Sequence, residues 1–227
     1  MSLKDLYNEL SEESKASLGK GSSKITQSGT HLVTIESMMV IDESRVKVDF
    51  KNASGQTIDL TGFLTDEDHA KQKAKVKRVM NMLAQMCTAA GVDLKSVFAK
   101  SVTGTVDYKS GTVSTEEYPT IRGKKLYITT YTEVEADQRD IKKTWDRQVV
   151  DSFKFFDTKK RNGLEISSEA DEGTTMEAAD EEAKSRVEAA WRSRNNAAVQ
   201  ARVAVLLGGK TTNTAAGDTT NVPDEDI

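Results

Sequence analysis

The sequence has one cysteine and no long apolar run, and each absence excludes a class of protein. Cys87 alone cannot form an internal disulfide, which fits a reducing cytoplasm. No uninterrupted apolar stretch approaches the roughly 18 residues that a membrane-spanning helix needs, so we expect no membrane span. The first ten residues, MSLKDLYNEL, are charged and lack an apolar signal core. We therefore expect a cytoplasmic protein rather than a secreted one.

Motifs for catalysis and metal binding are also missing. The two histidines are His31, in a predicted strand, and His69, in the first turn of a predicted helix, and neither has a second ligand at useful spacing. The patterns GxSxG, GxGxxG and the P-loop do not occur. Cys87 falls on the apolar stripe of its helix, where an inert buried thiol is expected. We therefore expect no enzymatic activity, no metal and no cofactor.

Charge is abundant and unevenly distributed along the 227 residues. Residues 1–160 hold 25 Lys and Arg against 23 Asp and Glu, whereas residues 161–227 hold 7 against 13. The first part can carry a basic groove, and the second is an acidic appendage.

Three neighbouring strands are predicted. The run at 31–41 is rich in β-branched and apolar residues, and the runs at 45–51 and 56–63 alternate apolar with polar residues. The turns between them are short, so we expect antiparallel pairing. The apolar period then changes to that of a helix, which begins near Thr65 and its following acids and stops at Gly91.

The remaining segments extend this pattern on both sides. We expect a brief helix at 93–100, strands at 102–108 and 125–135, a long loop at 109–124 between those strands, and an extended segment at 147–157. The predicted organisation is an N-terminal helix and linker at 1–28, a core domain at 29–160, an acidic linker and one long C-terminal helix within 161–208, and a disordered acidic tail at 209–227. The long helix is expected from about Thr174 to Leu207, because its interior is rich in Ala, Glu and Arg.

This element order predicts a mainly β fold with helices, in the α+β class. The strands suggest an OB-like five-stranded β-barrel with a helix between strands three and four, although other small barrels share that order. Barrels of the OB type bind single-stranded nucleic acid with a basic groove and aromatic stacking platforms.

The stretch GKKLYITTY (123–131) places Tyr127 and Tyr131 on the face opposite Leu126 and Ile128. That face should be shared with basic residues of the second strand, which suggests a path for a nucleic-acid strand. The alternative is that both tyrosines pack beneath a loop or the C-terminal helix.

A second cluster combines Trp145 with nearby cations, and burial of Trp145 in the core is its alternative. The basic run at 71–78 is more typical of a solvated helix face. Together the candidate nucleic-acid-binding residues are Arg45, Lys47, Lys51, Arg122, Lys124, Lys125, Tyr127, Tyr131, Lys142, Lys143, Trp145, Arg147, Lys154 and Phe155.

Four segments of the sequence carry a family resemblance: GTHLVTIESMMVIDESRVKVDF, MLAQMCTAAGVDL, GKKLYITTYTEVE and WDRQVVDSFKFFD, followed by the acidic tip NVPDEDI. With these the chain resembles the small single-stranded-DNA-binding proteins of tailed bacteriophages. The resemblance implies an OB-type core and an acidic tip that recruits replication proteins and competes with DNA. The tip residues here are Asp224, Glu225, Asp226 and Ile227, although the terminal phenylalanine usual in the family is absent.

The resulting hypothesis is a protein that coats single-stranded DNA during phage replication or recombination. Stacking platforms do not distinguish DNA from RNA, so single-stranded RNA is an alternative ligand. We expect homo-oligomers formed through Trp191 and residues 203–207, and the alternative is that the long helix packs back onto its own barrel. One alternative is a DNA-binding cofactor that recruits a phage RNA polymerase to melted promoters. The other is a virion structural or assembly protein that uses the long helix.

Overall fold

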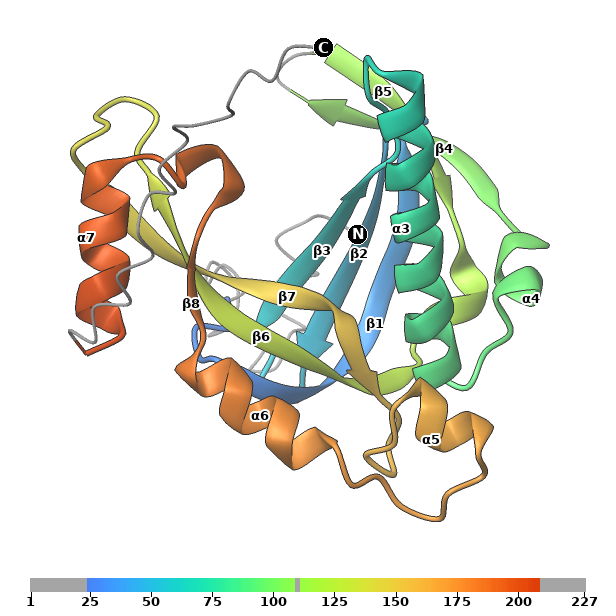
Figure 1. Ribbon diagram of the computed structural model, residues 1–227. Coiled ribbons are helices and arrows are strands. Elements are labelled where there is room, and N and C mark those ends of the chain that lie inside the picture. Colours follow the sequence, from blue (N-terminus) through green and yellow to red (C-terminus); the bar gives the residue numbers. More distant parts are fainter. Residues whose placement is uncertain (1–23, 109–110, 209–227) are drawn as a thin grey trace, which may run out of the picture.

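The computed structural model describes residues 24–108 and 111–208 (Figure 1). These residues form an α+β fold with an open, mostly antiparallel sheet of eight strands and five helices. The strands are β1 (Gly29–Ile41), β2 (Arg45–Asn52), β3 (Thr57–Phe63), β4 (Val102–Tyr108), β5 (Gly111–Glu117), β6 (Lys125–Ala136), β7 (Thr144–Phe156) and β8 (Val187–Ala189). The helices are α3 (His69–Ala89), α4 (Leu94–Phe98), α5 (Gly163–Ser167), α6 (Met176–Ser185) and α7 (Ala197–Leu206), with short 3-10 turns η1 (Pro119–Ile121) and η2 (Trp191–Ser193).

The long strand β1 organises the sheet. It pairs with β2 over most of its length, with β6 through its N-terminal half and with β5 through its last residues. Because β2 also pairs with β3, and β6 with β7, five strands run in the order β3-β2-β1-β6-β7. The β4–β5 hairpin branches from the end of β1, and β8 pairs with β6 in parallel.

The main core lies between the inner face of these strands and α3 (Figure 1). In β2 the predicted alternation is confirmed, since Val46, Val48 and Phe50 are all buried. Helix α3 contacts both β3 and β7, and these two strands also contact each other. The close approach depends on Gly62, where a Cβ atom would lie 2.7 Å from a methyl carbon of Val79.

The prediction of a loop at 109–124 is wrong, because this segment contains β5 and η1. The sheet consequently has more strands than the five that the sequence predicted. The β-branched residues Thr112, Val113 and Thr115 favour an extended backbone, and they pair with β4. Alternation of apolar residues is weak here because much of the hairpin is exposed on both faces. After β5, Tyr118 is buried and meets Phe98 edge to face, with 5.2 Å between ring centroids.

The predicted single helix at 174–207 is also wrong. The segment forms α6, β8, η2 and α7 in succession. Residues 187–189 are extended rather than helical, because they pair with the edge of β6. The backbone N–H of Ala190 then donates to the carbonyl oxygen of Val134 at 2.8 Å. A new helix begins after Asn196, whose side chain accepts from the N–H groups of Ala198 and Val199.

The predicted boundary at residue 29 falls too late. Ile25 is 3% exposed within the main core, and Lys24 forms an isolated bridge with Thr57. Two predicted features lie outside the described residues. They are the helix near the N-terminus and the acidic tail with Asp224, Glu225, Asp226 and Ile227. Within the described part, no helix is long and apolar enough to span a membrane.

Candidate nucleic-acid interface

Tyr127 and Tyr131 lie on the outer face of β6, but the C-terminal segment covers that face. Tyr127 packs against a small apolar cluster that contains Phe156 and Met176. The guanidinium carbon of Arg186 lies 3.9 Å from the ring centroid of Tyr131. Burial raises the pKa of Tyr131, as expected for a phenol removed from water. Both tyrosines are therefore half-buried rather than open to solvent.

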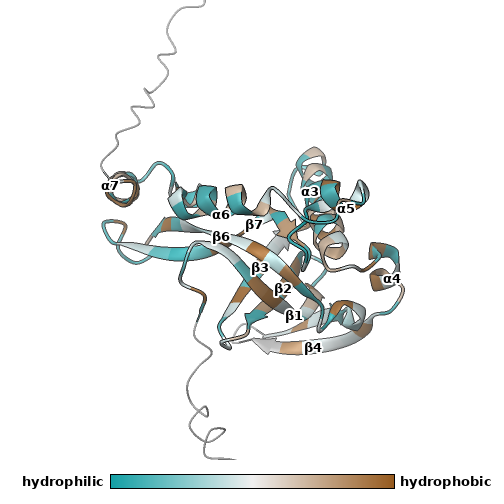
Figure 2. Cartoon of the chain, turned by 90° about the horizontal axis from the view of Figure 1, so that it is seen from below, coloured by the Kyte–Doolittle hydropathy of each residue, from teal (hydrophilic) through white to brown (hydrophobic). Residues whose placement is uncertain are grey.

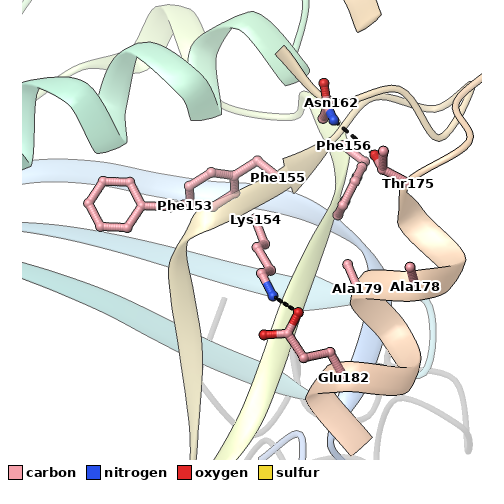
Figure 3. Close-up of a pocket in the computed structure, with 9 residues that line it drawn as sticks. All are labelled: Phe153, Lys154, Phe155, Phe156, Asn162, Thr175, Ala178, Ala179 and Glu182. Carbon is pink, nitrogen blue, oxygen red and sulfur yellow. Dashed lines mark hydrogen bonds and ion pairs between the residues drawn. The ribbon is translucent and has the colours of Figure 1, made fainter. Parts of the chain in front are cut away.

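An acidic side chain of α6, Glu182, reaches the sheet and contacts Lys154 of β7 (Figure 3). Glu182 forms an ion pair with Lys154 at 2.6 Å, beside a pocket of about 250 Å³ between α6 and the C-terminal part of β7. Phe155 lines this pocket but is 3% exposed and belongs mainly to the core. Two of the predicted binding residues on β7 are therefore not free to contact a nucleic acid. The ammonium group of Lys154 is paired with Glu182, and the ring of Phe155 is buried.

The β6–β7 hairpin ends in a connection that carries several exposed cations. Trp145 stands opposite Glu135 near the start of β7 and is 48% exposed. Lys142 and Lys143 precede it and are exposed, as is Ile141. Trp145 is therefore not part of the core, and it lies among the cations that the sequence predicted for it.

The turn η2 brings a second tryptophan to the same end of β6. Trp191 is 73% exposed and directly follows Ala190, which is bonded to β6. The N–H of Ala136 donates to the hydroxyl of Ser193 at 3.1 Å, and Asn196 donates to the carbonyl oxygen of Ile141 at 2.9 Å. These bonds tie η2 and the start of α7 to the hairpin, and Figure 1 shows α7 beside β6.

We call this region the hairpin-end surface. Its members share exposure and closeness to the end of β6, and they are Ile141, Lys142, Lys143, Trp145, Arg147, Trp191, Arg192 and Arg194. Sequence reasoning missed Arg192 and Arg194 and assigned Trp191 to self-association. The local string WRSR (191–194), a tryptophan among arginines, was the available signal.

Each tryptophan of the hairpin-end surface has an arginine against its ring. The guanidinium carbon of Arg147 lies 5.9 Å from the ring centroid of Trp145, and that of Arg194 lies 5.5 Å from Trp191. Such cation–π contacts place a positive charge beside a flat stacking surface.

Carboxylates neutralise part of this positive charge. Arg147 donates from Nε to Glu133 at 2.9 Å and lies 3.6 Å from Glu135. Lys143 pairs with an acid in the same connection. By contrast, Lys142 and Arg192 are exposed and form no ion pair with any described residue. The ammonium group of Lys142 and the guanidinium group of Arg192 can therefore bind an incoming anion.

The other predicted cations lie elsewhere. Lys51 of β2 and Lys125 of β6 flank Thr34 of β1 on one face, and both are exposed. Strands rise about 3.3 Å per residue, so the length of β6 separates Lys125 from the hairpin-end surface by roughly 36 Å. Arg122 and Lys124 are exposed near Lys125 and belong to this separate patch.

On the rest of β2, Lys47 forms an ion pair with Asp49 at 2.6 Å. Arg45 stands opposite Phe63, which is 53% exposed. The first turns of α3 add a further group of exposed cations at 71–78, in which Arg78 lies 5.5 Å from the ring of Phe153. The structure therefore distributes the predicted residues over separate surfaces, of which only the hairpin end combines open cations with exposed tryptophans.

Among the described residues no group of three or more His, Cys, Asp or Glu side chains is arranged to hold a metal ion. No protein-family model matches the chain, and no curated protein sequence matches it.

Proposed function

We propose that this protein binds single-stranded nucleic acid, with single-stranded DNA as the principal ligand, through the hairpin-end surface. The observation that carries the proposal is the pair of exposed tryptophans, Trp145 and Trp191, on two segments joined by hydrogen bonds to the end of β6. Both have an arginine at the ring. Stacking of a base on such a side chain is worth about 1–3 kcal/mol, and the adjacent cations attract phosphates.

The arrangement of the five central strands supports an OB-type core for this function. The order β3-β2-β1-β6-β7, the contact of β3 with β7 and the position of α3 after the third of these strands all agree with that fold. On this assignment the connection between β6 and β7 is the loop between the fourth and fifth barrel strands. OB-folds use that loop to bind single strands.

The phage role remains a proposal that rests on the sequence resemblance. The protein coats exposed DNA during replication or recombination and is not an enzyme. The acidic tip at 224–227 recruits a replication protein or a phage RNA polymerase, and a pull-down with and without these residues tests that part.

Intrinsic fluorescence gives a direct test, because the chain has only two tryptophans and both belong to the proposed interface. A dT oligomer is titrated into the protein at two salt concentrations, with emission and the anisotropy of a labelled oligomer recorded together. We expect quenching that saturates with the anisotropy signal, weakens as salt rises and is smaller with duplex DNA.

Binding without quenching would move the interface to another surface, such as the patch around Lys51 and Lys125. Absence of any anisotropy change at low salt would overturn the proposed function.

A further inference from the structure

Strand β4 is an open edge of the sheet. It pairs with β5 on one side, and no described strand pairs with its other side. Figure 2 shows it along the lower margin of the folded part. Val102 is 58% exposed and Val106 is 37% exposed. An exposed edge with apolar β-branched residues is a ready template for another strand, and proteins usually protect such edges.

The sequence of this edge is self-complementary. Residues 102–106 read Val-Thr-Gly-Thr-Val, which is the same in both directions about Gly104. If two copies pair antiparallel with Gly104 on the two-fold axis, Val102 of one copy stands opposite Val106 of the other. Thr103 then stands opposite Thr105. A two-fold interface requires this kind of self-matching surface.

We propose that two copies of this chain associate through their β4 edges to form one continuous antiparallel sheet. The pairing satisfies the unpaired backbone N–H and C=O groups of both edges. It also places valine opposite valine and threonine opposite threonine, and cross-strand side-chain pairs of this kind stabilise a sheet. At the axis, Gly104 has no side chain to obstruct the approach of the two backbones.

A second copy fits this edge better than an unrelated strand does, because only a two-fold pairing makes use of the palindrome. The contact is one strand long and is smaller than a standard stable interface, so we expect the dimer to depend on protein concentration. The association needs no nucleic acid, and it uses a surface separate from the hairpin end.

Cysteine cross-linking can read the register of this pairing. Residues opposite each other in antiparallel strands have Cα atoms about 4.5–5.5 Å apart, within disulfide range. The native Cys87 does not interfere, since it is buried and burial raises its pKa to about 12. In Gly104→Cys the new Cβ lies 3.4 Å from the hydroxyl oxygen of Thr115, an ordinary contact.

The full-length variants Gly104→Cys, Thr103→Cys, Thr105→Cys and Ser114→Cys are oxidised without nucleic acid and examined on non-reducing gels. Ser114 is the matched control, because it is exposed on the neighbouring strand β5 rather than on the edge. We expect Gly104→Cys to form a covalent dimer alone. Thr103→Cys and Thr105→Cys should do so only when mixed with each other.

The native chain should also show a mass that rises towards twice 24.9 kDa with concentration in light scattering. Cross-linking of Gly104→Cys no faster than of Ser114→Cys would overturn the proposal. So would a constant monomeric mass of the native chain. Neither result would bear on nucleic-acid binding, which the fluorescence titration tests independently.

Discussion

One carboxylate oxygen of Asp180 accepts two hydrogen bonds from Thr30, at 2.6 Å from its backbone nitrogen and at 2.9 Å from its hydroxyl. This contact joins α6 to the first strand of the sheet. The preceding residue must be glycine, because Gly29 has φ +127° and a Cβ there would lie 2.7 Å from the same oxygen. Lys184 completes the site with an ion pair to Asp180 at 2.6 Å.

Replacing Asp180 with alanine should loosen α6 and destabilise the protein by about 1–3 kcal/mol, because the N–H of Thr30 loses its partner. The free energy of unfolding in urea measures the effect. Glu181→Ala is the control, since that side chain is exposed and, among the described residues, forms an ion pair only with Lys184. It should change stability by less than about 1 kcal/mol. Equal effects of the two substitutions would show that the Asp180–Thr30 contact does not anchor the helix.

Loss of either tryptophan of the hairpin-end surface should weaken binding of a dT oligomer. Trp145→Ala and Trp191→Ala should each raise the dissociation constant roughly 5- to 150-fold, the equivalent of about 1–3 kcal/mol of stacking. Anisotropy titration measures the change, and circular dichroism checks that the variants fold. Leu164→Ala, which removes an apolar side chain that is 82% exposed on α5, should leave affinity unchanged. An unaltered dissociation constant in both tryptophan variants would contradict the proposed interface.

Glu165 should make the stability of the protein sensitive to acid. Burial alone raises the pKa of this carboxyl, but hydrogen bonds from the backbone N–H groups of Thr174 and Asn162 and from the hydroxyls of Thr174 and Thr175 outweigh it and lower the pKa to about 2. Because the folded-state pKa lies below the ordinary value of 4.5, the stabilisation is present above pH 4.5 and is lost as the pH falls towards 2.

The comparison of the native chain with Glu165→Gln isolates this contribution. The difference in their free energies of unfolding should be constant from neutral pH down to about 5 and should shrink at lower pH. A difference that does not vary between pH 5 and pH 2.5 would mean that the ionised carboxylate is not what stabilises this segment.

Gly62→Ala should destabilise the protein by about 1–3 kcal/mol, because the added methyl group would overlap Val79 where α3 meets β3. Gly163→Ala is the matched substitution, since a Cβ there meets nothing within 4 Å. It should be neutral or stabilising by up to about 1 kcal/mol, since alanine reduces the freedom of the unfolded chain. Thermal unfolding followed by circular dichroism compares them, and equal melting temperatures would show that α3 shifts freely to accept the methyl group.

The sequence alone was sufficient to predict those strands that have one apolar and one polar face. Alternation is a local property, so Val46, Val48 and Phe50 could be assigned to the core without knowledge of their partners. The start of α3 was nearly located as well, since the cap is Asp68 rather than Thr65. Both residues belong to the same run of hydroxyl and acidic side chains.

The C-terminal region could not be predicted in the same way. Its Ala- and Glu-rich composition favours a continuous helix, but Val187 and Ala189 pair with β6, whose open edge is not visible in the local sequence. Tertiary pairing therefore overrides helical propensity. The same limit applies to the site. Trp145 has its cations beside it in the sequence, whereas Trp191 is brought to the same end of β6 only by the pairing of β8 and by η2.

The late position of β8 in the chain has a consequence during synthesis. The ribosome completes β6 roughly fifty residues before β8 follows, which at about 5–20 residues per second leaves an interval of seconds. During that interval a nascent chain presents the bare edge of β6, with Tyr131 uncovered, to its neighbours on the same messenger RNA. Mispairing between nascent chains is therefore most probable in this window, and a slower decoding of residues 137–186 would prolong it.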